Sequence, residues 1–306
     1  MLMPRQASRA FGATEAAIYR RLVQPTGPKL LTSTDAMESV AGTGANSLSH
    51  TMSSLESKGV LKRIGKGVYL NRSTGLAPKI VDVIPWVFKN TRYYYLGLNA
   101  IANHWGLSPQ IPYSYSVIYT PRDDAQLKRI ARWSLMLGKA EKDLGGTLAP
   151  VVAHTTEVGR GMSQSIIEGS QLPVSTSERT LVDSVLYTKE IGGAGEALLW
   201  TRAGMSRSSI DYNELGQVLI KVYARVNSVA ARFGFLLEMA LSDLEVRAEY
   251  RASVNKLLTR LEGLSSKTRA TYNWGPEKTS VKYFQKWHLR VSTGYMKQLK
   301  EAPRLE

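Results

Sequence analysis

One segment of the sequence, residues 45–71, restricts the possible folds of this chain more than any other. Residues 45–57 favour a helix, because apolar residues recur at helical spacing and form one stripe: Leu48, Met52 and Leu55. Gly59 ends this helix. The following sequence, VLKRIGKGVYLN, has two β-favouring arms, 60–64 and 68–71, around Gly65-Lys66-Gly67. It predicts a β-hairpin with a basic tip.

Two shorter helices are expected before this segment. Residues 13–23 favour a helix capped by Thr14, and residues 35–40 favour a second one. Three short helices followed by a hairpin is the order of a winged helix-turn-helix. Residues 72–79, RSTGLAPK, look like a linker, so we place the first domain at residues 1–77.

The remainder predicts an α+β chain, in which a mixed α/β domain at residues 78–264 has a helical C-terminal part. The expected strands are 113–119 and 150–153. The expected helices are 92–105, 176–186 and 196–202, followed by three more between residues 212 and 264. Residues 265–306 contain fewer aliphatic side chains and are expected to form a partly ordered basic extension.

The net charge of +15 is concentrated at the two ends of the chain. Residues 1–75 contain 10 Lys/Arg against 4 Asp/Glu, and residues 246–306 contain 13 against 5. The middle, residues 76–245, is almost balanced, with 17 against 16. Two basic ends on a neutral centre indicate a polyanionic partner, although a solvated charged surface without a ligand is the plainer alternative.

The expected helix at 45–57 has the features of a DNA-reading helix. If its apolar stripe faces the core, the opposite face has no acid and no large apolar residue, and it consists of Asn46, Ser47, Ser49, His50 and Ser53. Cations of the hairpin and of the first helix are expected to meet backbone phosphates: Lys62, Arg63, Lys66, Arg20 and Arg21. The alternative is a winged helix that contacts only protein.

The sequence contains no recognisable catalytic or metal site. There is no Cys, and none of the four His belongs to an H-E-x-x-H pair. Gly169-Ser170 is not followed by an Asp-x-Asp, and no P-loop or G-x-S-x-G occurs. We therefore expect no enzyme activity, no catalytic residue, no bound metal and no cofactor. A nucleic-acid-processing enzyme tethered by a winged helix is the alternative from another class.

The sequence also has no membrane-spanning or secretory signal. No apolar run approaches the roughly 18 residues that a membrane helix needs. The start, MLMPRQASRAF, is not followed by a long apolar stretch. A cytoplasmic location and no membrane partner are the expectation.

Four stretches resemble one family. LSHTMSSLESKGVLKRIGKGVYLN at 48–71 is similar to the N-terminal winged helix of AbiEi-type antitoxins. YYYLGLNAIANHWGL at 93–107 resembles that family's aromatic helix. LPVSTSERTLVDSV at 172–185, then GG at 192–193 and AARFGFLLE at 230–238, resemble two later helices in the same order. The resemblance covers about residues 10–245 and is most specific at Glu178-Arg179-Thr180-Leu181-x-Asp183.

The resemblance implies a DNA-binding antitoxin of a type IV toxin–antitoxin, abortive-infection system. Such proteins repress their own operon by binding repeated sites in promoter DNA, and they counter a toxin that resembles a nucleotidyltransferase. A stable complex with the toxin is not required. A transcription regulator outside toxin–antitoxin systems, or a scaffold that holds a partner, remains the alternative. For Glu178, Arg179 and Asp183 we favour a structural role, a cap and an internal ion pair, over a direct functional contact.

The C-terminal extension mixes aromatic rings with cations. A second nucleic-acid surface there would use Lys278, Lys282, Lys286 and Arg290, with rings available for stacking on bases. The preferred interpretation is that the rings pack on the second domain while the cations stay solvated, because soluble chains rarely expose many large rings. The rings are Tyr272, Trp274, Tyr283, Phe284 and Trp287.

Overall fold

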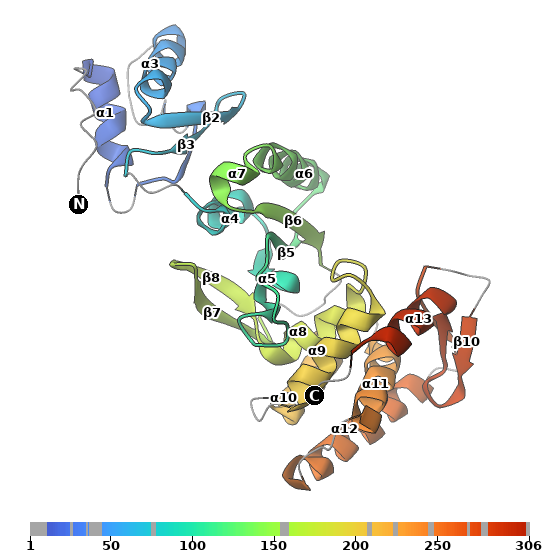
Figure 1. Cartoon of the computed structure of the whole chain (residues 1–306). Helices are drawn as coiled ribbons and strands as arrows, with labels where there is room; N and C mark the ends of the chain where they lie inside the picture. The colour runs from blue at the N-terminus through green and yellow to red at the C-terminus, as the bar shows by residue number, and fades with distance from the viewer. Residues whose placement is uncertain are drawn as a thin grey trace. The chain divides into compact units, whose positions relative to one another are not determined.

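The computed structural model describes residues 11–24, 27–34, 36, 45–74, 78–153, 159–206, 210–222, 226–243, 248–267, 270–276 and 281–303. The structure is mixed α/β, with several sheets (Figure 1). It divides into two compact units: unit 1 is Met1–Asn90 with Arg122–Leu148, and unit 2 is Thr91–Pro121 with Ala149–Glu306. Within the described part of the chain, no helix combines the length and apolar character that a membrane span requires.

This division differs from the expected boundaries at residues 77 and 264. Residues 78–90 and 122–148 supply helices to unit 1, and the C-terminal segment belongs to unit 2. A boundary read from composition alone missed both features, because each depends on packing between segments far apart in the sequence.

Unit 1 begins with two helices and a hairpin that the sequence predicts, and with one strand that it does not predict. They are helix α1 (Ala13–Leu22), strand β1 (Leu30–Thr32), helix α3 (Ala45–Ser57) and a hairpin of β2 (Leu61–Gly65) and β3 (Val68–Asn71). The three strands form an antiparallel sheet in the order β1-β3-β2. The expected helix at 35–40 lies outside the described residues, apart from Ala36, which is helical.

The core of this part is built from one face of each helix and the inner face of the sheet. It comprises Ile18, Leu22, Leu31, Ala36, Leu48, Met52, Leu55, Val60, Leu61 and Tyr69. The hairpin turns at Gly67, whose φ of +70° is a conformation that glycine adopts without steric cost. The expected cap of α1, Thr14, is wrong: Gly12 is the N-cap, and the Glu15 carboxylate accepts its backbone N–H.

Three more helices complete unit 1, and the sequence analysis did not predict them. They are α4 (Ile80–Phe88), α6 (Asp124–Gly138) and α7 (Glu141–Leu144). Asp123 caps α6, because its carboxylate accepts the backbone N–H of Gln126. Trp86 of α4 packs edge-on against Trp133 of α6, with ring centroids 4.3 Å apart.

Unit 2 contains a five-stranded sheet in the order β6-β5-β4-β8-β7. Its strands are β4 (Tyr93–Leu96), β5 (Ser114–Thr120), β6 (Thr147–Val152), β7 (Met162–Ile167) and β8 (Ser170–Ser175). The expected helix at 92–105 is wrong: its first part is β4, and only α5 (Asn99–Ala102) is helical. Consecutive tyrosines favour a strand, and Tyr95 is fully buried in the sheet.

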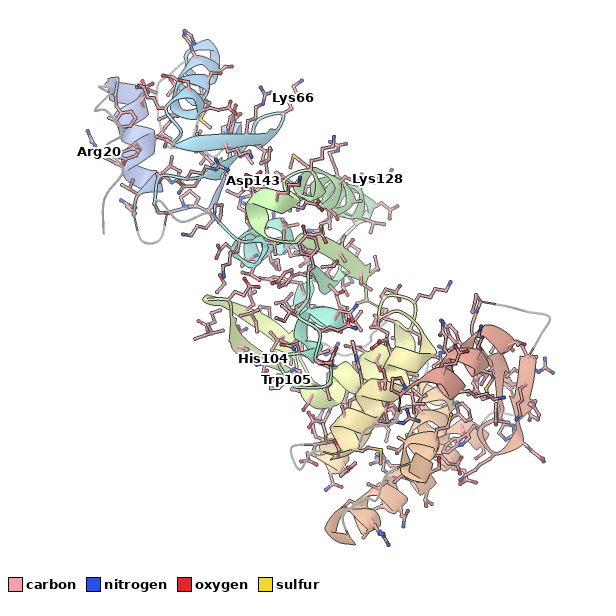
Figure 2. The ribbon with its side chains drawn as sticks, viewed as in Figure 1. Arg20, Lys66, His104, Trp105, Lys128 and Asp143 are labelled. Atoms are coloured by element: carbon pink, nitrogen blue, oxygen red, sulfur yellow. The ribbon has the colours of Figure 1, made fainter. Side chains whose placement is uncertain are left out.

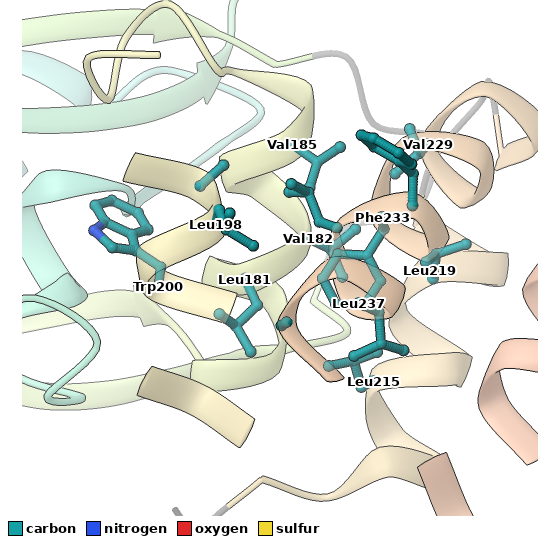
Figure 3. Packing of buried hydrophobic residues seen from close by; sticks show 14 of the residues in the cluster. Leu181, Val182, Val185, Leu198, Trp200, Leu215, Leu219, Val229, Phe233 and Leu237 are labelled. Atoms are coloured by element: carbon teal, nitrogen blue, oxygen red, sulfur yellow. The ribbon is translucent and has the colours of Figure 1, made fainter. Parts of the chain in front are cut away.

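A group of helices provides most of the core of unit 2. They are α8 (Ser177–Leu186), α9 (Ala194–Ser206), α10 (Tyr212–Val222), α11 (Val226–Asp243) and α12 (Ala248–Ser266), in agreement with the predicted helices. Figure 3 shows side chains of α8, α9, α10 and α11 meeting in this core, among them Leu181, Trp200, Leu219 and Phe233.

The C-terminal segment is a folded part of unit 2, so the expectation of a partly ordered extension is wrong. It forms β9 (Tyr272–Trp274), β10 (Val281–Phe284), the 3-10 turn η1 (Gln285–Trp287), β11 (Leu289–Ser292) and α13 (Thr293–Glu301). The strands make a sheet in the order β10-β11-β9. Trp274 and Trp287 are buried in the core, as the packing interpretation of the rings predicts.

Candidate nucleic-acid interface

Helix α3 buries the stripe that the sequence predicts and exposes the opposite face. Leu48, Met52 and Leu55 have at most 3% of their surface exposed. Ser49, His50 and Ser53 are exposed. The side chains of Asn46 and Ser47 lie outside the described residues. The exposed face of α3 therefore offers hydroxyls and an imidazole without a carboxylate.

An ion pair connects the start of α1 to the residue that follows α3. Lys58 Nζ lies 2.5 Å from Oε2 of Glu15, and both side chains are largely shielded from solvent. Hydrogen bonds from Lys58 and Ser54 lower the pKa of Glu15 from 4.5 to about 2. Arg20 and Arg21 lie in the last turn of α1 and are exposed. The pair holds the start of α1 beside the end of α3.

The carboxylate of Glu15 makes the stability of unit 1 depend on pH. Its lowered pKa means that it stabilises the fold above pH 4.5 and loses this effect as pH falls towards 2. We expect Glu15→Gln to lower the free energy of unfolding by about 1–2 kcal/mol at pH 7, after allowance for solvent screening. Urea unfolding of both proteins at pH 7 and pH 3 measures this. A difference that does not shrink at pH 3 would contradict the ionic origin.

The hairpin presents two of its three predicted cations to solvent. Lys66 is exposed at the tip and Arg63 is exposed on β2 (Figure 2 labels Lys66). The Nε of Arg63 donates to the carbonyl oxygen of Gly65, 3.2 Å away, and its backbone N–H donates to the carboxylate of Glu56. These bonds position Arg63 close to the tip, and its guanidinium retains further donors for a phosphate.

Lys62, the third predicted cation of the hairpin, is bound within the protein. Its Nζ lies 2.5 Å from Oδ2 of Asp143 in α7, and Nη2 of Arg72 lies 2.6 Å from the other oxygen of the same carboxylate. One acid therefore neutralises much of the charge of two cations at the base of the hairpin. A phosphate at Lys62 would have to compete with Asp143, which distinguishes this residue from Arg63 and Lys66.

Helix α6 is a basic element that the sequence analysis overlooked. Lys128, Arg129 and Arg132 are exposed on it, and Lys139 is exposed at its C-terminal cap. The signal was present in the sequence: apolar residues at helical spacing follow the capping Asp123, namely Leu127, Ile130, Trp133 and Leu137.

The segment Glu178–Asp183, on which the sequence resemblance is most specific, lies in the interior of unit 2. Arg179 and Asp183 are fully buried, with Nε and Oδ2 3.8 Å apart one helical turn along α8. The guanidinium also lies over the ring of Tyr95, 4.3 Å from the centroid, and Tyr95 donates to Asp183. Glu178 accepts the backbone N–H of Asp211, just before α10. The structure therefore contains the internal ion pair that the structural interpretation predicts, whereas the cap of α8 is Thr176 and not Glu178.

Burial sets the protonation of this network. It raises the pKa of Tyr95 well above its usual value, and the neighbouring charge of Asp183 acts in the same direction. Tyr95 is therefore a neutral hydrogen-bond donor at physiological pH, which suits its bond to the Asp183 carboxylate.

The predicted second nucleic-acid surface, on the C-terminal segment, is only partly available. Lys282 and Arg290 are exposed, whereas Lys278 lies outside the described residues. Lys286 Nζ lies 2.6 Å from the carboxylate of Glu238, and this hydrogen bond raises the pKa of Lys286. Burial opposes ionisation of Glu238, but bonds from Lys286 and Trp287 lower the pKa of that carboxyl overall.

The described residues also contain a hydrogen bond between a histidine and a serine. Nε2 of His104 lies 3.1 Å from Oγ of Ser165, and His104 packs edge-on against Trp105 (Figure 2). Among the residues that the structure describes, no group of three or more His, Asp or Glu side chains is arranged to hold a metal ion. We therefore assign no site to His104.

Comparisons with known proteins identify a structure with a similar fold, but they do not assign the chain to a family. No protein-family model matches the chain, and no curated protein matches it. Among solved structures, the crystal structure of the RV2827C protein from Mycobacterium tuberculosis is similar, with a TM-score of 0.58. The match covers 98% of each chain at 13% sequence identity, so the likeness concerns the fold alone.

Proposed function

We propose that this chain is a DNA-binding antitoxin of the AbiEi type, which represses its own toxin–antitoxin operon. In this proposal α1, α3 and the β2–β3 hairpin form a winged helix-turn-helix, and the partner of unit 1 is promoter DNA with repeated sites. The observation that carries the proposal is the exposed face of α3 together with the cationic tip of the hairpin, both in unit 1.

The chemistry of this face suits a major groove. A helix without carboxylates on its outer side approaches bases and phosphates without charge repulsion, and short Ser side chains allow close contact. Ser49, His50 and Ser53 occupy that position here. The hairpin tip then contacts the backbone through Arg63 and Lys66, and backbone contacts fix the register from which bases are read.

The antitoxin part of the proposal rests on the sequence resemblance, and the structure limits how unit 2 can act. Because Arg179 and Asp183 are fully buried, they do not touch a toxin directly. Unit 2 would counter a nucleotidyltransferase-like toxin through other residues, without a requirement for a stable complex. Growth of cells that express the product of the neighbouring gene, with and without this chain, tests that part.

Salt dependence tests the DNA-binding part. We expect the full chain to bind duplex DNA from upstream of its own gene more tightly than shuffled DNA. Arg63→Ala with Lys66→Ala should reduce the slope of log K against log salt by about 1.8, at about 0.9 for each lost phosphate contact. Fluorescence anisotropy from 50 to 200 mM salt measures the slope.

Lys62→Ala is the internal comparison for this experiment. Because Asp143 already binds Lys62, we expect a smaller change in slope than for either Arg63 or Lys66 alone. A double variant with the wild-type slope would show that the hairpin does not touch phosphate, and a chain that binds no duplex would refute the DNA-binding proposal.

A further inference from the structure

From Lys128 to its C-terminal cap, the solvent-facing side of helix α6 carries cations and no acid, whereas the exposed Asp124 begins the helix four residues before Lys128. Lys128, Arg132 and Lys139 follow one another at spacings of four and seven residues, so they lie on one side of the helix, together with Leu135. All four side chains are exposed, and Leu135 retains 74% of its surface. Between Asp124 and Glu141 the sequence contains no acid.

These cations are not engaged with the rest of the described structure. No ion pair or side-chain hydrogen bond joins Lys128, Arg132 or Lys139 to another described residue. This contrasts with Lys62 and Arg72 in the same unit, both of which are bound by Asp143. Within the described part of the chain, these three cations are therefore available to a partner.

Packing holds α6 beside the hairpin. A Cβ placed on Gly65, at the end of β2, would lie 2.1 Å from the sulfur of Met136, so the backbone of the hairpin and α6 are in direct contact. Asp143 of α7, which follows α6, adds the two ion pairs to Lys62 and Arg72. Figure 2 shows Lys66 at the hairpin tip and Lys128 on α6, both on unit 1.

We propose that the outer side of α6 binds the phosphate backbone of the same duplex that the hairpin tip contacts. This inference rests on the proposed DNA binding and extends its surface beyond the winged helix. From Lys128 to Lys139 the helix rises by about 17 Å, at about 1.5 Å per residue. Measured along the duplex axis, that length equals the rise of about five phosphates of one strand, at about 3.4 Å each.

The chemistry favours nucleic-acid backbone over other anionic partners. Phosphates form a regular array at fixed spacing, which a row of flexible Lys and Arg side chains meets without a shaped pocket. The contact would carry no sequence information, because no base edge is involved. It would instead add affinity and fix the orientation of unit 1 on a site longer than the one that α3 reads.

Paired charge removal tests the proposal. We expect Lys128→Ala with Arg132→Ala to reduce the slope of log K against log salt by about 1.8. The ratio of the wild-type to the variant binding constant should therefore be about 12-fold smaller at 200 mM salt than at 50 mM. The matched control is Lys256→Ala with Arg260→Ala, an exposed Lys/Arg pair at the same spacing on α12 of unit 2, which should keep the wild-type slope. Alanine favours helix, so circular dichroism should show unchanged helix content.

Duplex length gives a second readout. A second duplex is shortened by about five base pairs at the end that α6 is proposed to contact. On this duplex the α6 variant and the wild type should bind equally, because the phosphates that α6 would contact are gone. If the α6 variant keeps the wild-type slope on long duplexes, the inference is wrong. This holds also if α6 is found to bind an acidic protein, because the inference concerns DNA. If only the Arg63/Lys66 variant changes the slope, this inference fails and the proposed function stands. If no duplex is bound, both fail.

Discussion

Replacing Arg179 with methionine is expected to lower the free energy of unfolding of unit 2 by about 3–5 kcal/mol, because the change leaves a buried carboxylate without its cation. Asp183 is fully buried, and its neighbours in the network are Arg179 and Tyr95. Methionine approximates the volume of the arginine stem, so the loss reports charge and hydrogen bonding more than a cavity. Guanidinium-chloride unfolding followed by tryptophan fluorescence measures it.

The pH dependence distinguishes this explanation from a packing defect. In the Arg179→Met protein, the pKa of Asp183 should lie above its unfolded value, because burial disfavours the unpaired carboxylate. A raised carboxyl pKa gives stability that is lost as pH rises, so the variant should recover part of its deficit at pH 5 relative to pH 8. An equal deficit at both values would contradict an unpaired charge.

A double variant provides the control. Arg179→Met with Asp183→Asn removes both charges and keeps an acceptor for the hydroxyl of Tyr95, so it should be more stable than either single variant. Asp183→Asn alone should be destabilised at every pH, because arginine cannot release its proton. The burial of Arg179 and Asp183 argues against a direct functional contact. A variant at either residue that is as stable as the wild type, yet does not protect cells from the toxin, would contradict this.

The parts of the fold that the sequence predicted are those with a local signal. The stripe of α3 and the Gly65-Lys66-Gly67 turn lie within 27 consecutive residues, 45–71. The first is a helical period and the second is a pair of glycines between two β-favouring arms, so neither requires tertiary information. The stripe of α8 is equally local.

The predictions that were wrong concern elements that depend on contacts between distant segments. The sequence predicts one helix at residues 92–105, but the pairing of β4 with β5 and β8 makes the first part of this segment a strand. In the candidate interface, the exposed cations of the hairpin followed from the sequence. The capture of Lys62 by Asp143 did not, because 81 residues separate the two.

The C-terminal segment shows the same limit, because its composition resembles that of an exposed basic tail. Its burial depends on Gly234 of α11: a Cβ there would lie 2.2 Å from the ring of Trp287, so only glycine leaves room for the indole. Neither residue alone predicts this contact. Truncation near Ser265 would remove β9, β10, β11 and α13 together with two buried tryptophans, and point variants are the cleaner test.

Trp287→Ala is expected to destabilise unit 2 by about 3–5 kcal/mol, the usual cost of removing a large buried ring. Trp287 has 1% of its surface exposed, and its Nε1 donates to the Glu238 carboxylate at 2.7 Å. Trp287→Phe should cost less, since it keeps much of the apolar volume and loses the five-membered ring of the indole with its N–H. Tyr283→Ala, at a ring with 47% exposure on β10, should change stability by no more than about 0.5 kcal/mol. Chemical unfolding of the three variants measures the series. Equal stability of Trp287→Ala and wild type would mean that the C-terminal segment folds independently of the α11 core, and the cations around it would then be free to act as the sequence first suggested.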